Sequence, residues 1–244
     1  MAKIFGIDVS KHNGKIDWKK VKADGVAFAI IRCGYCNNDG SIEVDPQFKT
    51  NMDGAIKAGV AVGVYVYSYA TSVDAARKAA QNVLDMVKGY NVTYPLCWDF
   101  EDEKWYGKNT KAQNTALCKA ALEVWEKAGW YAMLYTYKSF AENRLNMADL
   151  TAYDFWLAHY TSATTYKGSY GMWQYSSTGT VDGMEGNVDL NWAYKDYPAL
   201  VAKFGLNKAA VNDEISDLKA TIAKYEEERK AILSYAEAIR KILL

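Results

Sequence analysis

Short apolar runs alternate with helix-like segments over the first 135 residues, and this alternation restricts the possible folds more than any other feature. Successive parallel strands need a long crossover connection, which is usually a helix. The apolar runs predict strands over residues 4–9, 26–32, 60–67, 94–100 and 130–135. Strands and helices in this order form a parallel sheet with helices outside it, most simply closed into a barrel.

The segments between these runs carry the usual signals of helix ends. Acidic or hydroxyl side chains stand where the helices should begin, and glycines stand where they should end. The residues that mark the predicted ends are Asp17, Asp45 with Pro46, Gly59, Gly89, Thr110 with Gln113, and Gly129. Each of the first strands is therefore followed by a predicted helix.

Beyond residue 135 the alternation breaks down. Strands are predicted over residues 155–160, 172–175 and 188–192, with little helix between them. A regular eight-fold repeat is therefore not expected. The sequence predicts an α/β fold, an irregular TIM-like β/α barrel.

From about residue 209 the composition changes to a heptad pattern with one charged break. The positions recur in steps of three and four, at Ile215, Leu218, Ile222, Tyr225, Arg229, Ile232, Ala236, Ile239 and Leu243. We expect a barrel domain over residues 1–205 and an amphipathic helix within residues 206–244. The helix is predicted to form a coiled coil through which the chain self-associates or docks on another subunit. Packing of the helix back onto the barrel is the alternative.

Two carboxylates close the fourth predicted strand. Residues 94–101 form an apolar run that ends in Asp99 and Glu101, one residue apart. In a strand the two side chains point the same way, and their repulsion raises at least one pKa. Paired carboxylates are typical of glycoside hydrolysis. A solvated acidic loop after a strand is the alternative interpretation.

Asp8 and Asp189 lie near the ends of two other predicted strands. In α/β barrels the carboxyl ends of the strands converge on one mouth, where catalytic groups gather. The two aspartates could therefore meet Asp99 and Glu101 in one pocket.

Five further residues are predicted to contact a substrate: Tyr65, Tyr67, Arg32, Trp173 and Gln174. Tyr65 and Tyr67 alternate on the third strand and face one way, where they contact sugar or pack in the core. Arg32 is costly to bury without a carboxylate, so we expect it to pair with one of the site acids. Trp98 should face away from Asp99, into the helix layer.

The composition argues against several classes of partner. Lys+Arg and Asp+Glu balance at 29 each, so no basic excess attracts nucleic acid or an anionic membrane. No apolar run approaches the roughly 20 residues that span a bilayer. Residues 1–8 enter a strand directly and show no secretory signal, so synthesis in the cytoplasm without a signal peptide is expected. The 19 Tyr and 8 Trp suit carbohydrate faces as well as cores.

Four cysteines are scattered along the chain, at Cys33, Cys36, Cys97 and Cys118. Cys33 and Cys36 have C-x-x-C spacing, but no second such pair follows, and only His12 and His159 could complete a metal site. We expect buried, reduced thiols, and we predict no metal and no cofactor.

An ordered set of short motifs resembles the family 25 glycoside hydrolases, the Chalaropsis-type lysozymes. The matching segments lie at residues 6–10, 13–18, 30–32, 63–67, 98–101, 155–158, 173–176 and 188–191. The resemblance implies an irregular barrel of five β/α units and three further strands. It also implies hydrolysis of the β-1,4 bond between N-acetylmuramic acid and N-acetylglucosamine in bacterial peptidoglycan, with net retention.

The resemblance also implies roles for the acids. Glu101 would be the general acid, with a pKa near the working pH. Asp99 would either attack the anomeric carbon or orient the N-acetyl group of the substrate to do so. Asp8 and Asp189 would tune the charge and hold sugar hydroxyls.

The leading interpretation is a phage or prophage endolysin that reaches the cell wall after release and lyses the bacterium. The alternatives are a chitinase-like hydrolase of N-acetylglucosamine polymers and a non-catalytic scaffold that binds cell walls.

Overall fold

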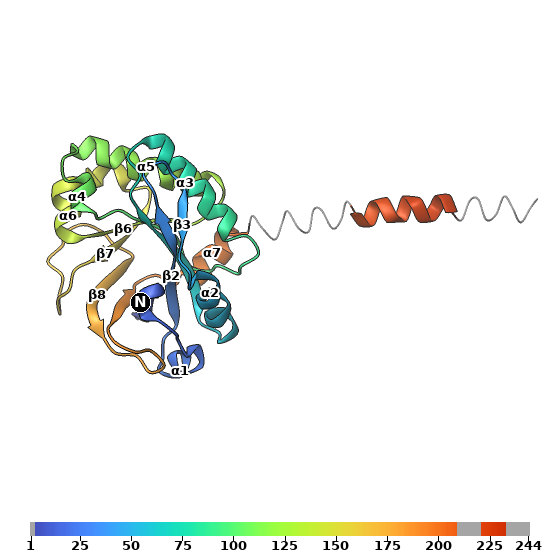
Figure 1. Ribbon diagram of the computed structural model, residues 1–244, viewed down its shortest axis with the longest axis horizontal. Helices are drawn as coiled ribbons and strands as arrows, with labels where there is room; N and C mark the ends of the chain where they lie inside the picture. The colour runs from blue at the N-terminus through green and yellow to red at the C-terminus, as the bar shows by residue number, and fades with distance from the viewer. Residues whose placement is uncertain (1–2, 209–220, 233–244) are drawn as a thin grey trace, which may run out of the picture. The chain divides into compact units, whose positions relative to one another are not determined.

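The structure, a computed structural model, describes residues 3–208 and 221–232. The chain divides into two units, Met1–Asn207 and Lys208–Leu244. The first unit contains every strand of the described chain and all of the predicted site residues. Figure 1 shows this unit with its helices arranged around the strands.

The strands of the first unit form one sheet that closes on itself. The sheet runs in the order β1-β9-β8-β7-β6-β5-β4-β2-β3, and pairing of β1 with β2 closes a barrel of eight strands. Only the short β3 lies outside this barrel, on the end of β2. The strands are Ile4–Val9 (β1), Phe28–Cys36 (β2), Ile42–Val44 (β3), Ala61–Ser68 (β4), Leu96–Asp99 (β5), Ala132–Tyr137 (β6), Asp154–Ala158 (β7), Met172–Gly179 (β8) and Val188–Ala193 (β9).

Strand direction explains why the barrel is irregular. Within the barrel, the neighbours among β1, β2, β4, β5, β6, β7 and β8 are parallel, whereas β9 is antiparallel to both β8 and β1; β3, outside the barrel, is antiparallel to β2. Five strands, β1, β2, β4, β5 and β6, are each followed by helix, and β7, β8 and β9 complete the ring. The predicted α/β barrel is confirmed.

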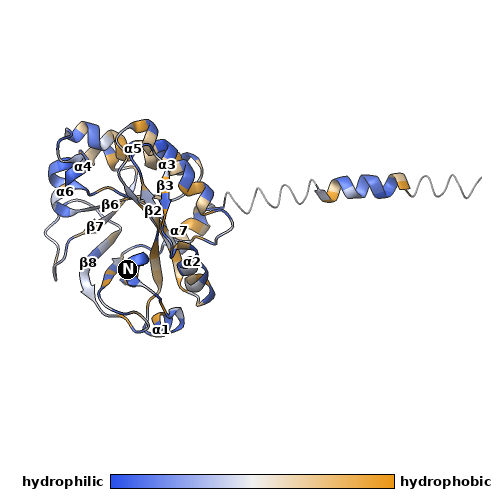
Figure 2. Ribbon diagram, in the orientation of Figure 1, coloured by the Kyte–Doolittle hydropathy of each residue, from blue (hydrophilic) through white to orange (hydrophobic). Residues whose placement is uncertain are grey.

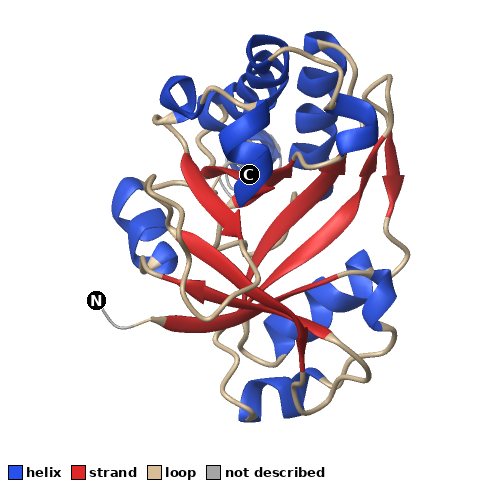
Figure 3. Ribbon diagram, turned by 90° about the vertical axis from the view of Figure 1, so that its left-hand side faces the viewer, coloured by secondary structure: helices blue, strands red, loops and turns tan. Residues whose placement is uncertain are grey.

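The helices lie outside the strands, as Figure 3 shows. Figure 2 shows hydrophilic and hydrophobic stretches side by side along α3 and α5, as expected for helices with one buried face. The helical elements are Lys11–Asn13 (η1), Trp18–Ala23 (α1), Phe48–Lys57 (α2), Val73–Met86 (α3), Glu103–Tyr106 (α4), Lys111–Lys127 (α5), Lys138–Arg144 (α6), Met147–Leu150 (η2) and Tyr197–Phe204 (α7).

Two of the predicted helix starts are confirmed at their side chains. The Asp17 carboxylate accepts from the backbone amides of Lys19 and Lys20 at the start of α1. Thr110 and Gln113 form the predicted capping box of α5.

The predicted start of the second helix is wrong. The helix α2 begins at Phe48, and Gln47 rather than Asp45 is its N-cap. The Asp45 Oδ1 accepts from the Gln47 amide at 2.9 Å, in a turn that precedes α2, while its Oδ2 pairs with Arg32.

Alternation along the strands fills the barrel interior. Phe28 and Ile30 of β2, Cys97 of β5 and Met133 of β6 form one buried cluster. A larger cluster packs between the strands and the helices, where Trp98 meets Trp125 of α5 with ring centroids 6.0 Å apart. The prediction that Trp98 faces the helix layer is confirmed.

The cysteines match their prediction. All four are free and buried. Burial raises the pKa of the Cys33 and Cys36 thiols above the ordinary value, which disfavours the thiolate.

The described part of the second unit is a helix over residues 221–232. Within it the predicted heptad residues Ile222, Tyr225 and Ile232 are more than half exposed. Ile215, Leu218, Ala236, Ile239 and Leu243 lie outside the described residues. Among the helices that the structure describes, none is long and apolar enough to cross a membrane.

Candidate active site

A cavity of about 300 Å³ opens at the end of the barrel where the parallel strands finish. All four predicted acids line it. Asp8 comes from β1 and Asp99 from the last position of β5, and Glu101 follows two residues later. The convergence expected at the mouth of a barrel is therefore present.

Asp189 reaches this mouth by a different route from the other acids. It lies near the start of β9, and its register partner is Asp8 on β1. Because β9 runs antiparallel to β1, the start of β9 lies beside the end of β1. The prediction placed Asp189 at a strand end, and the reversed strand direction brings it to the same cavity.

Asp99 and Glu101 share this cavity because the residue between them points the other way. Phe100 is fully buried, and its ring stacks on Tyr106 of α4 at 3.8 Å between centroids. The Tyr106 hydroxyl lies 2.9 Å from the Ser68 hydroxyl at the end of β4. These contacts fix the chain on the outer side and hold both carboxyl groups toward the cavity.

The cavity makes its carboxyl groups hard to ionise. Burial raises the pKa of Glu101 to about 7, and the charges of Asp102 and Asp189 add to this effect, while the Tyr135 hydroxyl opposes it. Burial likewise raises the pKa of Asp189 to about 6. The pKa of Asp99 is also raised, first by burial and then by Glu101 and Asp8, against the opposing charge of Arg32. Glu101 can therefore hold a proton near neutral pH.

Asp8 is held by two side-chain amides. Its Oδ2 accepts from Gln174 Nε2 and Asn191 Nδ2, each at 2.8 Å. Asn191 Oδ1 accepts in turn from Trp156 Nε1 at 2.8 Å. An indole nitrogen only donates, so this bond fixes the Asn191 amide with its NH₂ group toward Asp8. Both amides therefore favour the ionised form of Asp8, against the burial and the Asp189 charge that raise its pKa.

Asp99 has no comparable support. Its Oδ1 is buried and accepts no hydrogen bond from the described residues. A buried carboxylate oxygen without a donor is costly, and it is available to a donor on a bound substrate.

Tyr65 and Tyr67 line the cavity, as predicted for residues that share a strand face. Tyr65 packs edge-on against Trp156 at 6.3 Å between ring centroids. Tyr67 contacts Tyr35 and Tyr69, which continue an aromatic surface outward from the cavity. Both tyrosines therefore present polar tips and ring edges to the site.

The predicted partner of Arg32 is wrong. Arg32 lines the cavity, but its guanidinium pairs with Asp45, with Nε and Nη2 at 2.8 and 2.7 Å from Oδ2. Its Nη1 also donates to the Tyr35 hydroxyl at 2.8 Å. Asp45 was assigned to a helix cap in the sequence, so its availability as an ion-pair partner was missed.

Trp173 also departs from its prediction. Gln174 lines the cavity, whereas Trp173 packs in the layer between strands and helices and donates from Nε1 to the His159 carbonyl at 2.9 Å. Adjacent residues of a strand face opposite sides, so only one of this pair could reach the cavity.

Several lining residues carried no prediction. They are Ser10, His12, Asn13, Tyr135, Trp156, Tyr160 and Asn187. Tyr135 lies on β6 beside Asp99. The alternation of inward and outward side chains near the end of β6 could have predicted that Tyr135 lines the cavity. The loop residues could not be found by periodicity.

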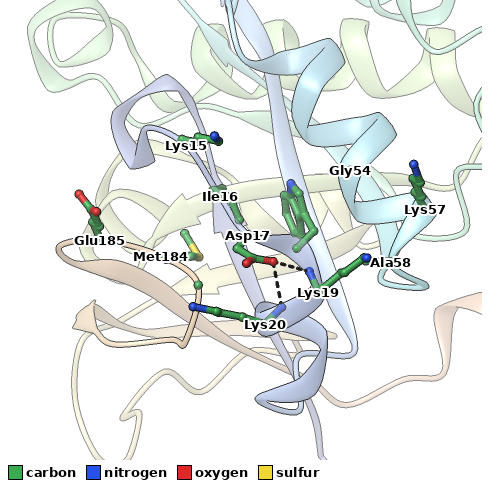
Figure 4. Close-up of a pocket in the computed structure, with 12 residues that line it drawn as sticks. Lys15, Ile16, Asp17, Lys19, Lys20, Gly54, Lys57, Ala58, Met184 and Glu185 are labelled. Atoms are coloured by element: carbon green, nitrogen blue, oxygen red, sulfur yellow. Dashed lines mark hydrogen bonds between the residues drawn. The ribbon is translucent and has the colours of Figure 1, made fainter.

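A larger cavity of about 660 Å³ lies beside α1 and α2 (Figure 4). Its lining contains Lys15, Lys19, Lys20 and Lys57 but only two acids. One of these, Asp17, is occupied with the α1 amides, as the dashed lines in Figure 4 show. This cavity lacks the paired carboxyl groups of the barrel mouth. Within residues 3–208 and 221–232, no three His, Cys, Asp or Glu side chains are placed to hold a metal ion.

Comparison with known families shows which family the chain belongs to. The profile of glycosyl hydrolases family 25 matches residues 7–184, which include three of the four acids. The chain belongs to glycosyl hydrolase family 25. The barrel is the family's fold.

Curated relatives and solved structures agree with the family. The chain is 28% identical over 187 residues to an autolytic lysozyme of Clostridium acetobutylicum, covering 76% of this chain and 54% of the relative. It is 29% identical over 201 residues to lysozyme M1 of Streptomyces globisporus, covering 77% and 67%. The autolysin LytC of Streptococcus pneumoniae, in complex with a synthetic peptidoglycan ligand, superposes with a TM-score of 0.69 at 27% identity. That match covers 79% of this chain and 47% of LytC, so the chain spans about half the length of two of these relatives.

Proposed function

We propose that this family 25 chain is an N-acetylmuramidase that cleaves the β-1,4 bond between N-acetylmuramic acid and N-acetylglucosamine in bacterial peptidoglycan. The observation that carries the proposal is the cavity at the barrel mouth. There Glu101, with a pKa of about 7, lies with the buried Asp8 and Asp99 and the half-buried Asp189 in a chain of glycosyl hydrolase family 25.

In this proposal Glu101 protonates the leaving oxygen as the glycosidic bond breaks. A general acid works best when its pKa lies near the operating pH, and burial supplies that pKa here. The same residue then accepts a proton from water in the second half of the reaction, as net retention requires.

Asp99 supports the positive charge that develops at the anomeric carbon. It can do so by direct attack or by orienting the substrate's N-acetyl oxygen for attack. The free Oδ1 of Asp99 favours the second route, because it can accept a hydrogen bond from the N–H of the acetamido group. The raised pKa of Asp99 also makes it a weaker nucleophile at low pH.

Asp8 and Asp189 complete the negative charge of the cavity. Asp8 is oriented by Gln174 and Asn191, so its second oxygen is the one left to bind a sugar hydroxyl. Tyr65, Tyr67 and Arg32 form part of the surrounding wall and contact the sugar. Gln174 acts mainly by holding Asp8.

Peptidoglycan of the bacterial wall is the proposed partner, and lysis of the bacterium is the proposed outcome. We also propose that the chain forms a homo-oligomer through residues 206–244. Several linked sites would bind a repetitive wall more tightly than one site does.

The two alternatives predict different products. A chitinase-like enzyme would cleave polymers of N-acetylglucosamine alone, and a non-catalytic scaffold would bind walls without releasing soluble fragments. Neither has a feature of the cavity in its particular favour.

The test is digestion of purified peptidoglycan, followed by reduction of the new ends with borohydride and their identification by mass spectrometry. We expect reduced muramic acid at every new end. Reduced glucosamine ends, or no new ends at all, would overturn the proposal. Nuclear magnetic resonance of the first product formed gives the anomeric configuration, which we expect to be retained.

A further inference from the structure

A second cavity borders the catalytic one. It measures about 430 Å³ and is lined by Tyr137, Lys138, Ser139, Ala158, His159 and Tyr160, which we call the Tyr137 groove. Tyr160 lines both cavities. Its hydroxyl donates to Gln174 Oε1 at 2.9 Å, within the group of residues that holds Asp8. A polymer bound at the acids can therefore continue into this groove.

The walls of the Tyr137 groove are aromatic and held in place. Tyr137 ends β6, and its ring packs edge-on against Phe140 at 5.5 Å between centroids. Tyr160 is 57% exposed, although its hydroxyl is tied to Gln174. Ala158 also lines the groove and contributes only a methyl group to its wall. Such rigid rings offer apolar contact area at little entropic cost.

The charged and imidazole side chains of the groove, Lys138 and His159, already have partners within the protein. Lys138 Nζ bonds Glu142 at 2.7 Å. His159 Nδ1 lies 2.9 Å from the Thr164 hydroxyl, and the His159 carbonyl accepts from the Trp173 indole. The groove therefore presents apolar walls and no unpaired charge, which suits a neutral ligand better than an acidic one.

We propose that the Tyr137 groove binds an uncharged N-acetylated pyranose of the glycan strand, beyond the two sugars at the cleaved bond. This inference rests on the proposed function, because it takes the strand to be the ligand of the catalytic cavity. The apolar face of the sugar lies against Tyr137 or Tyr160. The groove thereby makes long strands better substrates than short ones.

A filling substitution tests the groove without removing a buried contact. Ser139 is exposed and lines the groove, so S139W places a ring in it. Ser169 is also exposed, and it lines a separate cavity with Tyr131 and Asp154, so S169W is the matched control. The variant Y137A removes one wall instead and gives a second measurement if S139W folds poorly.

The measurement is kcat/KM on peptide-free glycan oligomers of increasing length. For S139W we expect a fall of about tenfold on long oligomers, the effect of losing one stacking contact, and little change on the shortest oligomer cleaved. The S169W control should behave as the unsubstituted chain. An equal effect on all lengths, or none on any length, would overturn the inference.

A second arm separates the sugar from the attached peptide. If the groove held the acidic stem peptide, S139W would weaken action on intact peptidoglycan but not on peptide-free strands, and the inference would be wrong. Binding is measured apart from cleavage by calorimetry with peptide-free oligomers on E101Q and on the E101Q/S139W pair. Length-dependent binding that S139W abolishes supports the groove even if the cleaved bond differs from the one proposed. Absence of cleavage by the unsubstituted chain would count against the proposed function alone.

Discussion

Two buried aspartates at opposite ends of the barrel have opposite surroundings. Asp154 begins β7, and its Oδ2 accepts from the hydroxyls of Tyr131 and Tyr197 at 3.2 and 2.9 Å and from Lys195 Nζ at 2.8 Å. Asp99 ends β5, and its Oδ1 has no donor among the described residues.

The difference separates stability from catalysis. A buried carboxylate with several donors stabilises the fold, whereas one that lacks donors costs free energy and is kept only where it acts. In α/β barrels the end where the parallel strands begin contributes stability, and the end where they finish carries the chemistry. Asp154 and Asp99 show this division between the two ends of the same barrel.

The largest effect is expected at the catalytic end. E101Q should lower kcat on peptidoglycan by roughly 10²–10⁴-fold, because the proton donor is lost. Thermal unfolding should show that E101Q is at least as stable as the unsubstituted chain, since a costly buried acid is removed. Near-normal turnover would remove Glu101 from the role of acid.

The opposite pattern is expected at the other end. D154A should lower the free energy of unfolding by about 1–3 kcal/mol, because two partly buried tyrosine hydroxyls and Lys195 lose their acceptor. Activity per folded molecule should be unchanged. The exposed Asp149 provides the control D149A, which should change neither quantity. A loss of activity greater than the loss of folded protein in D154A would contradict the division.

A smaller effect is expected where the two functions meet. N191L keeps the size of the side chain but removes the donor to Asp8 and the acceptor for Trp156. As a positioning residue it should lower kcat by about tenfold and shift the pH profile, since the pKa of Asp8 rises when a donor is lost. A change in stability with an unaltered pH profile would indicate a purely structural role.

The pH dependence of stability gives a further comparison. Burial raises the pKa of Glu101 to about 7 and that of Asp189 to about 6, above values of about 4.3 and 3.9 in the unfolded chain. The folded state therefore holds these protons more tightly, so their contribution to stability is greatest below about pH 4 and is lost as the pH rises to about 7. Melting temperatures of E101Q and the unsubstituted chain should diverge in favour of E101Q between pH 5 and 8. Parallel curves would contradict the raised pKa.

The smallest catalytic effect is expected from the second unit. A chain truncated after Asn207 should keep its kcat/KM on soluble glycan oligomers and lose its ability to associate. Light scattering should give an oligomer for the full chain and a monomer for the truncated one. Equal monomeric masses would refute the proposed homo-oligomer.

Much of the fold could be predicted because it depends on local signals. Apolar runs and helix caps such as Thr110 placed β1, β2, β4, β5 and β6 and their helices but not the short β3, and the D-x-E run placed Asp99 and Glu101 on one face. The predicted start of α2 was wrong because Asp45 closes a turn with the Gln47 amide before the helix begins at Phe48.

The remaining site residues depend on pairings that a sequence pattern does not contain. The antiparallel direction of β9 decides how Asp189 and Asn191 meet Asp8. Tyr135 and Trp156 come from ordinary aromatic strands, and Tyr160 follows β7 in a loop, so closure of the barrel alone turns them toward the acids. The prediction for Trp173 was wrong because it gave Trp173 and Gln174 the same role. Adjacent side chains of a strand point to opposite faces, so only one of them reaches the cavity.

The most direct measurement is a titration of the Glu101 carboxyl group by carbon-13 nuclear magnetic resonance, with its signal assigned by its absence from E101Q. We expect this group to titrate with a pKa of about 7, because the cavity disfavours its ionised form. A pKa near 4.3, the value of a solvated glutamate, would contradict the account, because Glu101 would then be ionised at neutral pH and could not donate the proton.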